Sequence, residues 1–221
     1  MTSTQDAPST AADIRNPFFA RFYHHVLGRG ESPRFVDLRR ELLEGLTGRV
    51  IEIGPGNGPN FGLYPAAVGE VIAVEPEPYL RRRATEAAAK APVQIAVVSG
   101  DAEHLPVADA SVDAVVFALV LCSVPDPTRA LSEATRVLRP GGQLRVLEHV
   151  VAEQPFGRRA QRIAEVTFWR RAFGNCHPTR DSRSALVQAG FDVSGVRRFV
   201  MRAAPIEPPL PYILGTAVLN P

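Results

Sequence analysis

Short apolar runs alternate with helical segments between residues 50 and 151, and this alternation limits the folds open to the chain. The runs have the length of buried strands, and they cover residues 50–53, 71–74, 93–98, 112–120 and 143–151. Helical patterns fill segments 80–90 and 128–138 between them. Strands joined through helices pair in parallel and are buried on both faces of one sheet. The sequence therefore predicts an α/β fold with a doubly wound, mostly parallel sheet in a single domain.

The last part of the chain breaks this alternation. A helical segment at 181–189 is followed by two apolar stretches, 191–200 and 212–219, and the Pro-rich segment 205–211 separates them in place of a helix. Parallel strands need a long crossover connection, whereas antiparallel strands do not. We therefore expect these stretches to form an antiparallel pair that adds an antiparallel C-terminal strand to the sheet.

Composition divides the rest of the chain into three parts. Residues 1–13 are rich in Ser, Thr, Ala and Asp, which predicts a disordered tail. Residues 14–46 carry apolar side chains at helical spacing and are expected to form N-terminal cap helices. The main domain spans 47–221 and contains an insertion at 152–178. Because this insertion and segment 18–27 both carry aromatic clusters, we expect them to form a lid over a ligand, with permanent, inert packing as the alternative.

Charge and cysteine content limit the classes of partner. The formal net charge of +2 is too small for the concentrated basic face that a nucleic-acid partner requires. Two cysteines are too few for a disulfide scaffold or a typical zinc site, so we expect a reducing compartment and no metal. The sequence shows no signal-peptide pattern and no apolar run of about 20 residues. We expect a cytoplasmic protein without a transmembrane segment.

A glycine-rich loop follows the first predicted strand at residues 52–58, with the sequence Glu-Ile-Gly-Pro-Gly-Asn-Gly. Glycines let the chain turn sharply and let a ligand approach the main chain closely. We expect the loop to open a helix near Asn60. Nicotinamide enzymes also use such loops, but they favour the spacing G-x-G-x-x-G for a pyrophosphate, whereas this loop reads G-x-G-x-G. The loop therefore favours a nucleoside that carries an amino acid.

Two acids follow the next strands at the same predicted sheet edge. Glu75 ends the second strand, 21 positions after Gly54, where a carboxylate can accept both hydroxyls of a ribose. The alternative is an exposed acid at a strand end. Asp101 and Ala102 follow the third strand, near the expected position of a base, where a carboxylate can accept from an adenine amino group. The alternative for Asp101 is the N-cap of a following short helix.

Together these residues resemble class I S-adenosylmethionine methyltransferases. The loop at 52–58 is similar to the family's glycine-rich motif and Glu75 to its ribose acid, while 113–116 resembles its fourth strand and 137–142 the turn before the fifth. The resemblance implies a Rossmann-like fold, S-adenosylmethionine as cofactor and methyl transfer to a small-molecule acceptor. The cofactor-binding residues that it implies are Glu52, Gly54, Pro55, Gly56, Gly58, Asn60, Glu75, Pro76, Asp101, Ala102 and Leu119.

A closer resemblance, over roughly residues 35–221, is to the methyltransferase-like protein 7 family, which includes thiol S-methyltransferases of small alkyl thiols. The residues that carry it are 58–61, 64–65, 119–124, 148–150, Trp169 and 176–180. The resemblance implies that the acceptor is a thiol. The chain departs from animal members in lacking their N-terminal hydrophobic anchor, and Pro55 stands where Cys or Ala is commoner in this fold.

Several side chains are candidates for the chemistry at the acceptor. His149 ends the fifth strand, at the edge where ligands bind in doubly wound folds, and histidine titrates near neutrality. We expect it to act as a general base, with a structural histidine as the alternative. Glu148 should face the opposite side, where it orients a partner or pairs with an arginine. His177 is a further candidate base, and Cys122 is expected to be a buried small apolar residue. The expected acceptor-binding residues are Tyr23, Trp169, Phe173 and Cys176.

The sequence leaves several functions open. S-methylation of a small thiol is the leading interpretation, and O- or C-methylation of a natural product or quinone is the alternative enzyme. The chain lacks the G-x-G-x-x-G spacing that is typical of a nicotinamide dehydrogenase. Residues 118–121 also lack the amide-binding tetrad that is typical of a nucleic-acid methyltransferase. The alternative outside the enzymes is a non-catalytic partner protein that binds the cofactor. Such a protein is expected to carry a disrupted glycine loop, whereas the loop of this chain is intact.

Overall fold

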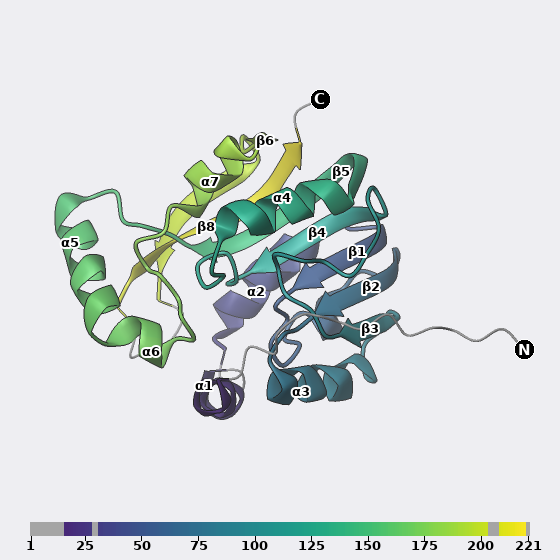
Figure 1. Ribbon diagram of the computed structural model, residues 1–221, viewed down its shortest axis with the longest axis horizontal. Helices are drawn as coiled ribbons and strands as arrows, with labels where there is room; N and C mark the ends of the chain where they lie inside the picture. The colour runs from purple at the N-terminus through teal and green to yellow at the C-terminus, as the bar shows by residue number, and fades with distance from the viewer. Residues whose placement is uncertain (1–15, 28–30, 203–207, 220–221) are drawn as a thin grey trace, which may run out of the picture.

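The computed structural model describes residues 16–27, 31–202 and 208–219, so the predicted tail at 1–13 lies outside the described residues. Its sheet has eight strands in the order β3-β2-β1-β4-β5-β8-β6, with β7 paired to β8 (Figure 1). The strands are β1 Gly48–Ile53, β2 Val68–Val74, β3 Ile95–Val98, β4 Val112–Ala118, β5 Leu138–His149, β6 Phe191–Asp192, β7 Val196–Met201 and β8 Leu210–Leu219. β1 to β5 pair in parallel, and β8 runs antiparallel to its three neighbours, which confirms the predicted fold class.

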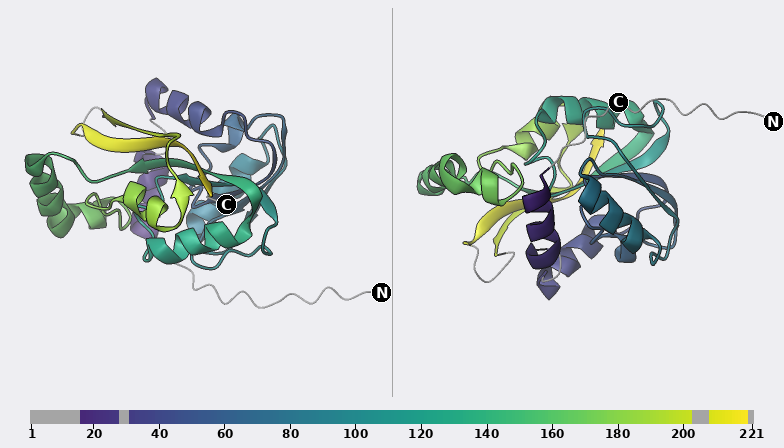
Figure 2. Two further views of the ribbon diagram at one scale, coloured as in Figure 1. Left: turned by 90° about the horizontal axis from the view of Figure 1, so that it is seen from above. Right: turned by 60° about the horizontal axis from the view of Figure 1, so that its bottom comes forward.

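Helices cover both faces of this sheet (Figures 1 and 2). The helical segments are α1 Pro17–Phe22, the π-helical turn η1 Tyr23–Leu27, α2 Pro33–Leu43, α3 Pro78–Ala88, α4 Pro127–Val137, α5 Pro155–Ala164, the π-helical turn η3 Glu165–Trp169, α6 Arg170–Ala172 and α7 Ser182–Gln188. Of these, α2, α3, α4 and α7 pack on the sheet. Side chains of Ser32, Glu77 and Asp126 accept backbone N–H groups at the starts of α2, α3 and α4, and a proline follows each cap. The sequence thus marks these helix starts locally.

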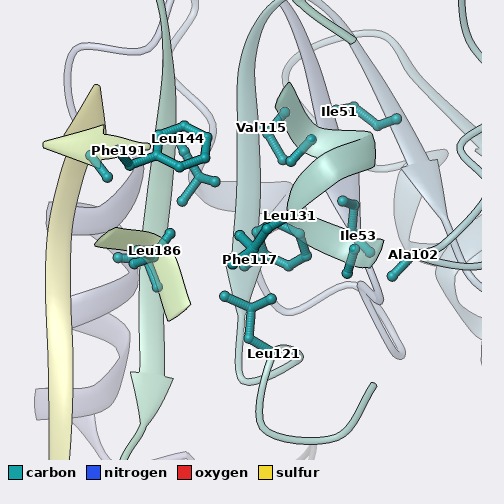
Figure 3. Packing of buried hydrophobic residues seen from close by; sticks show 14 of the residues in the cluster. Ile51, Ile53, Ala102, Val115, Phe117, Leu121, Leu131, Leu144, Leu186 and Phe191 are labelled. Atoms are coloured by element: carbon teal, nitrogen blue, oxygen red, sulfur yellow. The ribbon is translucent and has the colours of Figure 1, made fainter. Parts of the chain in front are cut away.

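Two apolar cores lie on opposite faces of the sheet, because side chains alternate along each strand. Val115 and Phe117 of β4 pack toward α4 and α7, against Leu131 and Leu186 (Figure 3). The intervening Val116 packs on the other face, in the core that includes side chains of α2 and α3. The strand is therefore buried on both faces, as its nearly continuous apolar sequence predicts.

The structure corrects several expected boundaries. The glycine loop opens no α-helix near Asn60 but only the 3₁₀ turn η2, Phe61–Leu63. Pro65 explains this, since the residue before a proline avoids helical geometry and Tyr64 is extended. The expected helix at 34–46 is Pro33–Leu43, and the expected strand at 191–200 is split into β6 and β7. Strand β5 starts directly at the end of α4 and stops at His149, the third strand starts at Ile95 and the fourth stops at Ala118.

Candidate active site

The glycine loop is held against the ends of two neighbouring strands. The backbone N–H of Gly54 donates to Val74 at the end of β2, at 2.9 Å, and the N–H of Gly58 donates to Pro55 at 2.9 Å. Gly54, Gly56 and Gly58 all have positive φ angles, between 60° and 83°. This region of backbone space favours glycine. The three glycines therefore let the main chain turn sharply at the carboxyl edge of the sheet.

Glu75 ties the loop to the end of β2. Its buried carboxylate accepts the N–H of Gly56 at 2.9 Å through Oε2 and the N–H of Glu77 at 3.0 Å through Oε1. Burial raises the pKa of Glu75 to about 7, although the two backbone donors oppose this shift. The adjacent Pro76 lies in the turn, where its carbonyl and that of Glu75 accept from Arg81. Glu75 is thus buried beside the glycine loop and is not the exposed strand-end acid of the alternative.

A buried polar network supports the loop from below. Asn60 accepts from Arg39 Nη1 at 3.0 Å and donates to Glu52 at 2.7 Å. Glu52 also accepts from the hydroxyl of Tyr64 at 2.7 Å, and Arg39 makes a two-point contact with Glu31. Burial raises the pKa of Glu52, while its two donors and the charge of Arg39 oppose the rise. Glu52 and Asn60 therefore join the loop to α2, and Arg39 and Tyr64 are members of the site that the sequence reasoning did not name.

Tyr23 was expected among the acceptor-binding residues, and its ring lies beside the glycine loop. A Cβ atom built on Gly56 would approach the Tyr23 ring to 2.9 Å, so the ring covers the loop. Desolvation raises the pKa of the Tyr23 hydroxyl to about 12. On the same helical segment Phe19 packs against Gly174, which lies within the insertion. Segment α1–η1 therefore bridges the glycine loop and the insertion, and Figures 1 and 2 show α1 between α3 and α6.

The ends of β3 and β4 contribute less regular backbone. Asp101 accepts the N–H of Glu103 at 2.8 Å and lies 3.2 Å from His104 Nδ1, in a turn and not at a helix start. The alternative of a helix N-cap is therefore wrong for Asp101. Ala102 is buried in the core of the α4 face. Leu119 has a φ of 64°, uncommon for a residue with a side chain, and its N–H donates to Leu147 on β5 at 2.8 Å.

Glu148 organises the loop after β4 and pairs with no arginine in the described part of the chain. Its buried carboxylate accepts three backbone N–H groups, those of Val120, Leu121 and Cys122, at 2.7, 2.9 and 3.3 Å. Burial raises the pKa of Glu148 to about 7 against the effect of these donors. Of the two roles expected for Glu148, these contacts correspond to orienting a partner, here the backbone after β4, and not to pairing with an arginine. With its oxygens committed to the main chain, Glu148 positions a loop and is a poor candidate for proton transfer.

His149 lies in an aromatic and sulfur-rich surrounding. Its ring is nearly parallel to that of Trp169, with 5.9 Å between centroids and 13° between planes, and Phe173 packs on Trp169 at 4.3 Å. The ring of Tyr212 on β8 also contacts the imidazole, with 5.4 Å between the ring centroids. Nδ1 lies 3.9 Å from Cys176 Sγ, and the buried Nε2 has no hydrogen-bond partner among the described residues. A buried nitrogen without a partner is uncommon in folded proteins and calls for a physical explanation.

The two cysteines meet beside this histidine. Cys176 Sγ lies 3.5 Å from Cys122 Sγ, and both are free thiols in the interior. The hydrogen bond shared with Cys122 and the neighbouring His149 lower the pKa of Cys176 to about 5, against burial. The same contact and burial raise the pKa of Cys122 well above its usual value. Sequence reasoning treated Cys122 as an apolar residue, and it missed this pair because 54 positions separate the partners.

His177 is held away from this cluster. Its Nδ1 lies 2.8 Å from Glu165, whose carboxylate also accepts from Thr179. Its backbone N–H donates to the carbonyl of Cys122 at 2.8 Å. His177 therefore fastens the end of the insertion to the loop after β4. The Glu165 carboxylate engages only Nδ1 of the ring, so the role of His177 as a base stays a prediction.

Comparisons with known proteins agree with this geometry. Residues 51–146 match the model of a methyltransferase domain family. Human thiol S-methyltransferase TMT1B is 35% identical over 196 residues, which cover 81% of this chain and 78% of that protein. The 27-O-demethylrifamycin SV methyltransferase of Amycolatopsis mediterranei is 32% identical over 168 residues, 70% of this chain and 62% of that protein. A solved S-adenosylmethionine-dependent methyltransferase from Thermotoga maritima, 22% identical, has a TM-score of 0.62 and shows the same fold over 91% of this chain and 94% of that one.

The cofactor of this family fits the site. A Cβ atom on Gly54 would lie 2.8 Å from the side chain of Val120, and one on Gly56 would meet Tyr23, so the loop needs glycine at these positions. The buried carboxylate of Glu75 next to this loop suits the hydroxyls of a ribose. Among the described residues, no helix is long and apolar enough to cross a bilayer. The chain is an enzyme that belongs to the S-adenosylmethionine-dependent methyltransferases, in the family of thiol S-methyltransferase TMT1B.

Proposed function

We propose that this enzyme methylates the sulfur of a small apolar thiol that binds between the cofactor and the aromatic wall of His149, Trp169 and Phe173. The observation that carries the proposal is the buried Nε2 of His149, which lacks a partner among the described residues and lies within an apolar surrounding. Pockets for small molecules are mostly apolar with a few placed polar groups. The similarity to thiol S-methyltransferase TMT1B supports sulfur as the acceptor atom.

The residues that we assign to the cofactor are those of the glycine loop and the strand ends near it. Glu75 accepts the ribose hydroxyls, Asp101 accepts the adenine amino group, and the backbone at Gly54 and Gly56 allows close approach. Bound S-adenosylmethionine supplies a methyl group that its sulfonium already activates. The protein's main task is then to place the nucleophile in line and close to contact, which can contribute about 7–11 kcal/mol in the best cases.

His149 removes the proton of the thiol in this proposal. A free thiol with a pKa near ~8.5 is ionised to only a few per cent at neutral pH, so a base raises the reactive fraction. With Cys176 as a thiolate, Nδ1–H of His149 donates to its sulfur. Nε2 then carries the lone pair and accepts the S–H proton of the acceptor. Cys176 acts through His149 as a positioning residue.

We also propose that α1–η1 and the insertion form a lid. The Tyr23 ring covers Gly56, so this segment has to move aside before a cofactor approaches the loop. Closure afterwards excludes water from the acceptor, which favours transfer. The thiol chemistry suits a reducing compartment, and we place the enzyme in the cytoplasm because both cysteines are free.

O-methylation of a natural product is the second candidate, since the rifamycin methyltransferase relative acts on an oxygen by its name. A hydroxyl is less acidic than a thiol and would depend even more on the base at His149. One experiment separates the two. Transfer of a labelled methyl group is measured with matched acceptors, such as benzyl mercaptan against benzyl alcohol and thiophenol against phenol. Labelling of the thiols supports the proposal, whereas labelling of the alcohols or phenols alone overturns it in favour of oxygen.

A further inference from the structure

Helix α5 is attached to the fold by a polar side chain. Gln161 is its buried residue, accepting the N–H of Ala152 at 2.7 Å and donating to the carbonyl of Val150 at 3.1 Å. Phe156 and Ile163 face solvent and are 85% and 63% exposed, as is Val166 of η3 at 78%. A packing helix normally buries its apolar stripe. This one presents it outward.

The exposed apolar side chains form one continuous stripe. Phe156 and Ile163 are seven residues apart and Val166 follows three residues later, which places them on one helical face. Phe168 at the end of η3 is also more than half exposed. Contiguous exposed apolar patches on soluble proteins commonly mark an interaction with a protein or a membrane. The stripe therefore needs a partner that accepts a convex, apolar helix face.

Positive charge surrounds this stripe. The arginines of α5, η3 and α6 are Arg158, Arg159, Arg162, Arg170 and Arg171. None of them takes part in an ion pair within the described ranges of the chain. The acid of the segment, Glu165, is engaged with His177 and Thr179. The outer surface of the segment thus combines apolar side chains with uncompensated positive charge.

The segment also lies at the edge of the molecule. Figures 1 and 2 show α5 at the periphery, away from the sheet. Beside Val166 the surface is hollowed over about 510 Å³, and Arg170 and Arg171 are among the residues that line the hollow. The turn η3, which continues α5, ends at Trp169, and Trp169 contacts His149. The outward stripe and the acceptor side of the active site are therefore two faces of one helical segment.

We propose that the outer face of α5–η3 docks on an anionic lipid bilayer. Phe156, Ile163 and Val166 enter the boundary between headgroups and acyl chains, and the arginines contact lipid phosphates at the rim. Basic amphipathic helices with an aromatic or aliphatic face bind membrane surfaces in this way. Self-association through the same face would bring two sets of arginines together, which disfavours a second copy as the occupant. Docking itself does not depend on the proposed thiol acceptor.

Flotation of the full chain with vesicles tests this inference. We expect the protein to float with vesicles of phosphatidylcholine mixed with phosphatidylglycerol, but not with phosphatidylcholine alone, and to be released at high salt. The double variant Phe156→Ser, Ile163→Ser should lower the bound fraction at least about tenfold, since it removes two large apolar contacts with the lipid. The double variant Arg159→Ala, Arg162→Ala should lose binding to the anionic vesicles because electrostatic attraction is reduced.

Matched controls keep the test clear. Val187→Ser and Val200→Ser alter valines that are also more than half exposed, but on α7 and β7, and they should leave flotation unchanged. Circular dichroism confirms that the exposed substitutions retain the fold. Absence of flotation, or equal flotation of the wild type and the Phe156→Ser, Ile163→Ser variant, overturns the inference. A change from dimer to monomer in that variant without lipid overturns it in favour of a second copy.

Discussion

The two halves of the sheet's carboxyl edge are built in different ways. At the ends of β1 and β2, the cofactor half consists of main chain and two acids within a short stretch, from Glu52 to Glu75. At the ends of β4 and β5, the acceptor half brings together side chains from distant parts of the chain, such as Cys122, Cys176 and Tyr212. One half is a local motif, and the other exists only once the insertion has packed.

This difference predicts how each half responds to change. The cofactor half depends on positive φ angles and close approach, which a single side chain disrupts. The acceptor half depends on packing and on one histidine, where a substitution alters a rate before it alters the fold. Substitutions in the first half should therefore abolish binding, and those in the second should lower turnover.

Gly56→Val should have the largest effect and abolish cofactor binding. Its Cβ would lie 2.9 Å from the Tyr23 ring, and its φ of +60° strains a β-branched residue. Calorimetry with S-adenosylhomocysteine should show a loss beyond about a hundredfold. Gly62→Ala is the matched control, because a Cβ there meets no atom within 4 Å. Normal affinity in a folded Gly56→Val protein would show that the loop does not bind the cofactor.

Glu75→Ala should have the second largest effect and lower the affinity for the cofactor by about a hundredfold or more. Each charged hydrogen bond that is lost is worth about 1.5–3 kcal/mol. The wild type should also bind more tightly as the pH rises from 6 to 8. Its Glu75 pKa is raised to about 7, and only the ionised carboxylate accepts both ribose hydroxyls. Titration calorimetry across this range checks both statements. Unchanged affinity in a folded Glu75→Ala protein would refute the ribose assignment.

The cofactor half could be predicted from the sequence because its signals are local. The glycine spacing and the acid that ends the second strand lie in one stretch, and parallel topology brings their strand ends together. The expected helix after the loop did not form because Pro65 ends it after one turn, a signal that was present in the sequence. The buried hydrogen bond from Arg39 to Asn60 joins α2 to the loop before η2, and no sequence pattern predicts it.

The acceptor half could be predicted only in part. His149 at the end of β5 follows from strand position, and Trp169 from aromatic content. The contact of Cys122 with Cys176 depends on how the insertion packs against the loop after β4, and hydrophobic periodicity in the sequence does not predict this packing. Glu148 was expected either to orient a partner or to pair with an arginine, and the structure shows it accepting three backbone N–H groups of the loop after β4. The hydrogen-bond partners of Glu148 depend on the geometry of this loop, including the positive φ of Leu119.

Glu148→Gln should flatten the pH dependence of stability in the ligand-free enzyme. The folded pKa of Glu148 is raised from 4.5 to about 7, so its contribution is fully present below pH 4.5 and is lost as the pH rises through 7. The loss amounts to roughly 3 kcal/mol in the wild type. Denaturant unfolding at pH 5 and pH 8 measures it, and the remaining slope includes Glu75, whose pKa is shifted alike. An unchanged difference between the two pH values would contradict this role of Glu148.

His149→Gln should lower kcat/KM about 10- to 100-fold with an alkyl thiol, while the Kd of S-adenosylhomocysteine stays unchanged. The loss should be small with thiophenol, which is already ionised at neutral pH and needs no base. His177→Gln is the control, because the His177 ring is held by Glu165 and lies outside the aromatic wall. Equal losses for both acceptors would assign His149 a packing role and not proton transfer.

The smallest expected effect concerns the lid that joins the two halves. Phe19→Ala removes the ring that packs against Gly174 and contacts Tyr23, but it leaves the residues of the glycine loop unchanged. If α1–η1 closes over both ligands, the variant should lose about fivefold in kcat/KM and in cofactor affinity together, because a looser lid admits water and releases the cofactor sooner. Deletion of residues 1–30 should enlarge both losses without unfolding the domain. Hydrogen exchange in α1–η1 and in 152–178 should slow when S-adenosylhomocysteine is added. Equal exchange with and without this ligand, in an enzyme whose truncated form keeps full activity, would show that both segments are inert packing and that the two halves work without a shared cover.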